Sequence, residues 1–86
     1  MDINDHRIME LIEVTANFTE EGVITPLHFT WKGSRFRVES TGRHWQDDHD
    51  QHMLVMVASG QIYELTFKVD ERRWYIGQAG PNRAAI

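Results

Sequence analysis

Apolar and polar residues alternate with a period of two along most of this chain. In residues 11–19 the apolar positions on one face are Ile12, Val14, Ala16 and Phe18. In residues 62–69 the corresponding positions are Tyr63, Leu65 and Phe67. The side chains of a strand point alternately to its two faces, so this pattern is typical of half-buried β-strands. The alternation predicts an all-β protein.

The stretch PLHFTWKGSRFRVES (26–40) predicts a β-hairpin. It contains two alternating runs whose apolar positions are Leu27, Phe29, Trp31, Phe36 and Val38. Lys32 and Gly33 separate the two runs, and glycine supplies the positive φ that tight hairpin turns need. Pro26 is expected at the first position of its strand, where a missing N–H group is tolerated.

Further features complete the predicted sheet. The stretch MLVMVA (53–58) is apolar on both faces, which favours a strand that is covered on both sides. Turns are expected at 59–61 and 70–73, followed by a last strand in 74–78. Together these elements predict five to six antiparallel strands with short connections. Such strands form a meander that curls into a twisted sheet or a small open barrel.

The chain length sets the size of the core. The 86 residues are expected to form a single small domain over 1–86, with loose ends at about 1–6 and 79–86. Residues 4–11 fit either a short helix capped by Asn4 or a strand. A short chain has few core positions, which favours large aromatic side chains there. The expected core consists of Trp31, Phe36, Trp45, Tyr63, Leu65, Phe67 and Trp74.

The composition excludes several classes of site. The chain has no cysteine, which excludes disulfides, thiolate metal sites and cysteine nucleophiles. No apolar run approaches the roughly 20 residues of a membrane helix. The acidic first residues also lack the basic and then apolar layout of a signal peptide. We therefore expect a cytoplasmic protein with no membrane partner.

The stretch RHWQDDHDQHM (43–53) is the densest group of potential metal ligands. It places His44, His49 and His52 among three aspartates, and imidazole with carboxylate is a suitable ligand set for Zn²⁺. A metal site, however, needs an element of structure that directs its ligands toward one point, and no helix is evident here. We interpret the stretch as a polar loop between two strands. A divalent-metal site at the three histidines is a distant alternative.

No residue set in the sequence predicts an enzyme or a cofactor. The serines fall at turns or strand ends, without the motif that surrounds a nucleophilic serine. The stretch GQAG (77–80) lacks the further glycines and the following helix of a phosphate-binding loop. We therefore expect a non-enzymatic interaction module that acts through contacts with a protein partner.

A basic group supports an alternative function as a nucleic-acid-binding accessory protein. Its members are Lys32, Arg35, Arg37 and Arg43. Arginines interleaved with aromatic rings contact phosphates and stack on bases. The alternation nevertheless places Trp31 and Phe36 on the buried face, away from the arginines. The net charge of −4 also opposes the approach of nucleic acid.

Two features favour a homodimer as well. A meander leaves two strand edges with unpaired backbone groups, and these invite pairing with another chain. One apolar face of MLVMVA (53–58) fills the core, and the other needs a cover. A second copy would supply that cover with a self-complementary surface.

Four parts of the sequence carry a further pattern, and they are PLHFTWKGSRFRV, Trp45, IYELTF and RWYI. Together these parts resemble a family of short bacterial domains of unknown function. Similar domains also occur as C-terminal pieces of Y-family DNA-polymerase-like proteins. The resemblance covers residues 26–76 and rests on packing residues, so it implies a fold and brings no catalytic or ligand residues. This sequence departs from the family pattern in its His/Asp-rich stretch and in its N-terminal strand. The resemblance implies an accessory role near DNA-repair machinery.

Overall fold

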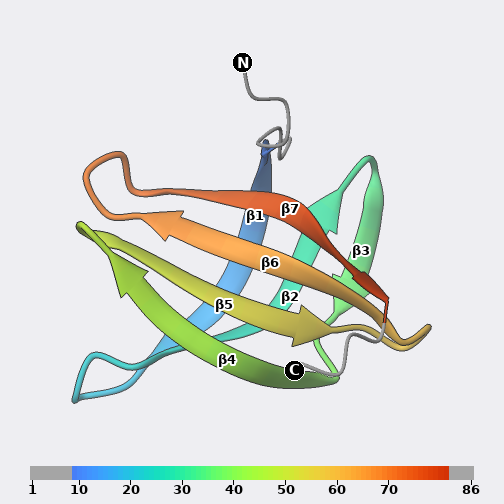
Figure 1. Cartoon of the computed structure of the whole chain (residues 1–86), viewed down its shortest axis with the longest axis horizontal. Helices are drawn as coiled ribbons and strands as arrows, with labels where there is room; N and C mark the ends of the chain where they lie inside the picture. Colours follow the sequence, from blue (N-terminus) through green and yellow to red (C-terminus); the bar gives the residue numbers. More distant parts are fainter. Residues whose placement is uncertain (1–8, 82–86) are drawn as a thin grey trace.

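The residues described by the computed structural model are 9–81, and they form an all-β domain (Figure 1). Within this range no helix is long and apolar enough to cross a membrane. The strands are β1 (Glu10–Phe18), β2 (Ile24–Trp31), β3 (Ser34–Arg37), β4 (Ser40–Asp47), β5 (Asp50–Met56), β6 (Gln61–Lys68) and β7 (Arg73–Pro81). The predicted all-β antiparallel architecture is confirmed.

The seven strands form one antiparallel sheet in the order β3-β2-β1-β7-β6-β5-β4. Its two edge strands, β3 and β4, are consecutive in the chain and are separated only by Val38 and Glu39. The Val38 N–H donates to the Leu27 carbonyl, and the Glu39 N–H donates to the Met56 carbonyl. The two edges of the sheet therefore meet at this link, and the sheet curls into a half-barrel.

Strand β1 forms the opposite side of the half-barrel. Residues 10–12 pair with β7, whereas residues 13–18 pair with β2. One strand thus belongs to two ladders, and it carries the chain from the layer β4–β7 to the layer β1–β3, which lies behind it in Figure 1. A strand that changes partner along its length is how small β proteins turn the corner between two crossing layers.

The β2–β3 turn has the conformation expected from its glycine. Lys32 has a φ of 52° and Gly33 a φ of 78°, and Trp31 pairs with Ser34 on either side of them. Positive φ at both central residues defines the type I′ turn, whose twist matches that of the flanking strands. The prediction of a positive φ at Gly33 is confirmed.

The stretch 43–53 corrects the sequence interpretation, because it is a hairpin and not a loop. Residues 40–47 are β4 and residues 50–56 are β5, with only Asp48 and His49 between them. Asp48 takes the positive φ of the turn, 58°, which aspartate tolerates better than most residues. The sequence predicts five to six strands, and the additional strand β4 brings the number to seven.

A β-bulge corrects the predicted face of Leu27. Thr15 pairs with His28 while the next residue, Ala16, pairs with Pro26, so Leu27 is the extra residue of β2. Pro26 is therefore buried and Leu27 is exposed, the reverse of the simple alternation. Pro26 is also the third residue of β2 and not the first. Bulges break the period of two on which the sequence prediction rests.

The ends of the described range limit two other predictions. Strand β7 continues to Pro81, so residues 79–81, predicted to be loose, belong to the sheet. Glu10 and Leu11 belong to β1. The rest of the proposed helix or strand at 4–11 lies outside the described residues except for Met9, which lies before β1. The remaining parts of the expected loose ends also lie outside.

The core fills the inner face of the half-barrel. Phe29, Met53, Val55, Leu65 and Ile76 are at most 1% exposed. Of the predicted core residues, Tyr63, Leu65 and Trp74 are buried, while Trp31, Phe36 and Phe67 are partly buried against them. Trp45 is the exception, because it pairs with His52 on the outer face of the β4–β5 hairpin.

Candidate functional site

Strand β4 has a free edge and lies at one end of the sheet in the described residues. Strand β4 pairs with β5 on one side, and it is the last strand of the described sheet on the other. All of its residues are exposed except Trp45, which is half-buried. Residues 40–47 contain neither proline nor lysine, the residues with which proteins commonly protect strand edges.

The hairpin turn determines which backbone groups of β4 face outward. Asp47 and Asp50 pair on either side of the two-residue turn, and in such hairpins the closing pair exchanges both backbone hydrogen bonds. Successive residues of a strand direct their N–H and C=O groups to opposite sides. Gln46 and His44 therefore direct theirs away from β5, toward the free edge.

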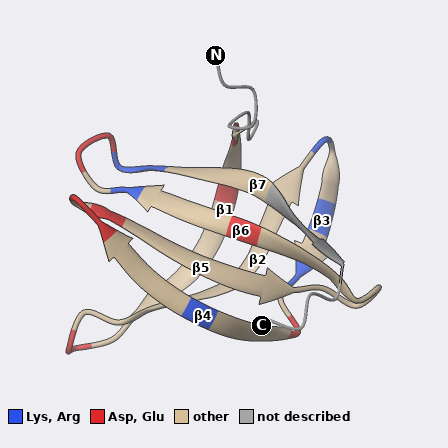
Figure 2. Ribbon diagram, in the orientation of Figure 1, with Lys and Arg blue, Asp and Glu red and all other residues tan. Residues whose placement is uncertain are grey.

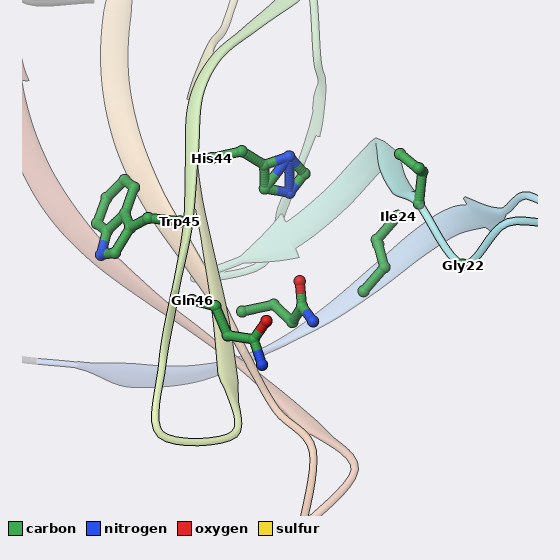
Figure 3. A pocket seen from close by; sticks show the side chains of 7 residues that line it. Gly22, Ile24, His44, Trp45 and Gln46 are labelled. Atoms are coloured by element: carbon green, nitrogen blue, oxygen red, sulfur yellow. The ribbon is translucent and has the colours of Figure 1, made fainter.

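The inner side of this edge borders a pocket of about 310 Å³. The residues that line it are Gly22, Val23, Ile24, His44, Trp45, Gln46 and Gln51. In Figure 3 the His44 and Gln46 side chains point toward the start of β2 at Ile24, whereas Trp45 points to the opposite side of the strand. The pocket thus places polar side chains of β4 opposite an aliphatic side chain of β2.

The outer side of the edge carries a stacked and hydrogen-bonded group. The Trp45 ring stacks on the His52 ring with a centroid separation of 5.1 Å and an interplanar angle of 10°. The Arg43 guanidinium carbon lies 5.3 Å from the Trp45 ring centroid. Trp45 therefore contacts both a cation and an imidazole, and these contacts restrict the orientation of its indole.

Buried partners hold His52 in place beneath Trp45. The His52 Nδ1 lies 3.0 Å from Glu64 Oε2 and 3.1 Å from Thr66 Oγ1. Thr66 is 1% exposed, and the His52 and Glu64 side chains are each 13% exposed. Hydrogen bonds in such a protected place are costly to break, because the separated groups would lack water. The Trp45 stack therefore rests on a fixed base.

The three candidate metal ligands do not converge. His44 pairs with Met53, whose side chain is in the core, so His44 faces inward. His52 faces outward beneath Trp45, and His49 is exposed in the turn. In the part of the chain that the structure describes, no group of three or more His, Cys, Asp or Glu residues could hold a metal ion.

This placement predicts the response to zinc. We expect micromolar Zn²⁺ to shift the melting temperature by less than about 2 °C, because true binding at a hundredfold excess over Kd would add about 2.7 kcal/mol. For a domain of this size, that would raise the midpoint by roughly 10 °C or more. The measurement is a thermal melt with and without Zn²⁺. A large shift that disappears when His44, His49 and His52 are all changed to alanine would contradict the prediction.

The basic residues lie on two separate parts of the molecule. Arg35 and Arg37 are exposed on β3, and the Lys32 Nζ lies 4.7 Å from the Trp31 ring centroid at the adjoining turn. Arg43 lies on β4, apart from the basic segments of β3 in Figure 2. Trp31 and Phe36 pack into the core, so the structure does not join these cations and rings into one stacking surface.

Two surface hydrogen bonds raise the pKa of their donor side chains, Lys68 and Tyr75. The Lys68 Nζ donates to Asp50 Oδ2 at 3.0 Å, and this hydrogen bond raises the pKa of Lys68. The Tyr75 hydroxyl donates to Glu71 Oε1 at 2.7 Å, and this hydrogen bond raises the pKa of Tyr75. Both shifts stabilise the protonated form, so neither side chain becomes a better base or nucleophile near neutral pH.

Comparisons with known proteins assign neither a family nor a function to this geometry. The resemblance to short bacterial domains therefore stays a prediction. Neither family models, curated proteins nor solved structures contain a match to this chain.

Proposed function

We propose that this protein is a non-enzymatic interaction module that binds a protein partner by strand addition at the free edge of β4. The observation that carries the proposal is the exposed edge of β4, with the His44 and Gln46 backbone groups directed outward. An extended segment of a partner pairs with such groups through its own main chain. Main-chain hydrogen bonds then supply affinity, and alternate side chains supply specificity.

The two faces of β4 suit this role differently. On the inner side, a side chain of the added segment would face the pocket between Gln46 and Ile24. On the outer side, it would meet the Trp45 ring, which Arg43 and His52 hold in place. Strand β3, at the other edge of the sheet, is a poorer template because it has only four residues, whereas β4 has eight.

The test isolates one backbone donor. Gln46→Pro removes the outward N–H group of Gln46, while Gln46→Ala removes the side chain and keeps that donor. We expect Gln46→Pro to lose a protein that wild type and Gln46→Ala both retain in quantitative affinity capture. Both variants should keep the far-UV circular dichroism spectrum of wild type, because Gln46 is exposed on an edge strand.

One result would contradict strand addition at β4. In it, no captured protein distinguishes Gln46→Pro from Gln46→Ala, so that recognition does not use this donor. Dependence on Arg35 and Arg37 with DNA or RNA as the captured molecule would support the nucleic-acid alternative instead.

A further inference from the structure

We infer that the partner strand at this edge is β4 of a second copy of the chain, paired antiparallel about a twofold axis at Trp45. The inference rests on the proposed function, because it uses the same free edge, and it names the partner. Twofold pairing places each residue of the edge opposite a residue of the same edge. A suitable edge must therefore be complementary to itself.

The outward backbone groups restrict the register. In an antiparallel pair, residues whose groups face the partner strand must lie opposite each other. His44 and Gln46 satisfy this condition when the axis passes Trp45, because His44 of each copy then lies opposite Gln46 of the other. An axis at His44 would also oppose outward-facing backbone groups, those of the two His44 residues. It would place Asp47 opposite Thr41, however, so that this carboxylate would have no basic partner.

Charge selects the same register. With the axis at Trp45, Arg43 of each copy lies opposite Asp47 of the other, which makes two oppositely charged pairs. An axis at Gln46 would place Arg43 opposite His49 and would leave Asp47 opposite Trp45. Opposite charges in directly opposed positions stabilise a sheet, and like charges there destabilise it.

The outer face then joins the two copies through their tryptophans. Trp45 and Asp47 alternate with the edge-facing His44 and Gln46, so they occupy non-hydrogen-bonded positions, where opposed side chains lie closest. Arg43 lies on the same side of the strand, since its guanidinium carbon is 5.3 Å from the Trp45 ring centroid. The two Trp45 rings would lie across the axis from each other, each resting on its own His52. Since two chains of net charge −4 repel at long range, these local pairs supply the attraction that brings the edges together.

A charge exchange tests the register. Arg43→Asp and Asp47→Arg should each raise the dissociation constant of the homodimer by about tenfold or more, since each places like charges across the axis. An equimolar mixture of the two variants should form a heterodimer, because one chain then carries acidic side chains at both positions and the other carries basic side chains at both. Each acidic position would lie opposite a basic one. Sedimentation velocity of each variant and of the mixture, from low to high micromolar concentration, measures the association.

The outcomes separate this inference from the proposed function. Wild type that sediments as a clean monomer of about 10.1 kDa at high micromolar concentration overturns the inference. In that case a partner captured by wild type and lost by Gln46→Pro would still uphold strand addition. A dimer that persists in Gln46→Pro assigns self-association to another surface, and a mixture that stays monomeric contradicts the pairing of Arg43 with Asp47. Either result also overturns the inference. We expect circular dichroism melts to show that Arg43→Asp and Asp47→Arg leave the fold intact, because both positions are exposed.

Discussion

Trp31→Ala is expected to lower the free energy of unfolding by about 3–5 kcal/mol, the usual cost of truncating a large aromatic in a core. The Trp31 ring packs edge-on against Tyr63 at a centroid separation of 5.4 Å and also contacts Phe36. Its Nε1 donates to Glu10 Oε1 at 3.0 Å, so the substitution also leaves Glu10 without this donor. Urea unfolding monitored by circular dichroism measures the change, which is a large fraction of the stability of a typical domain.

Trp45→Ala is the matched control, since the sequence predicts both tryptophans in one core. Trp45 stacks only on the outer face, and we expect its loss to cost about 0.5–1.5 kcal/mol, the range for an aromatic pair. The comparison should be made at low micromolar concentration, so that any self-association does not contribute. Equal destabilisation by the two substitutions would mean that the inner and outer faces of β4 have been exchanged.

Glu64→Ala should destabilise the protein by about 1–3 kcal/mol through its hydrogen-bond partners. Glu64 Oε2 lies 3.0 Å from His52 Nδ1 and accepts from Thr66 Oγ1 at 3.5 Å. Truncation leaves these shielded groups without their common acceptor. We also expect the Trp45 fluorescence to change, because the imidazole beneath the indole loses a group that orients it.

Glu71→Ala provides the comparison for this glutamate. Glu71 accepts a hydrogen bond of 2.7 Å from Tyr75, but both groups lie in an exposed setting. Water replaces an exposed partner, so this substitution should leave the free energy of unfolding nearly unchanged. A Glu71→Ala variant that is as unstable as Glu64→Ala would show that burial does not determine the value of these two carboxylates.

The predictable part of the fold is the part with one apolar face. Strands β1, β2, β3 and β6 are evident because apolar residues recur at every second position in their sequences, and Gly33 marks the turn between β2 and β3. Strand β4 escapes prediction because an edge strand exposed on both faces carries almost no apolar signal, and Trp45 is its only half-buried residue. The bulge at Leu27 escapes it too, since it depends on pairing with β1 and not on the local sequence.

The prediction of the candidate site fails for a similar reason, because the site is determined by the register between β4 and β5. The composition of 43–53 suggests a shared ligand set, but the register places His44 opposite Met53 and Trp45 opposite His52. A shift by one residue would reverse the face of every side chain, and nothing in the local composition determines that choice. The one local signal of a hairpin is Asp48, because aspartate tolerates the positive φ that it takes in the turn.

The short ladder between β1 and β7 has a consequence for how the chain folds. Only residues 10–12 and 74–76 pair in it, yet it connects the three-stranded unit β1–β3 to the four-stranded unit β4–β7. Each unit is built from hairpins between neighbouring strands, whereas this ladder closes nearly the whole chain into a loop. Closing a long loop costs conformational entropy before the new contacts compensate for it. The ladder is therefore the step at which we expect the folding rate of the domain to be decided.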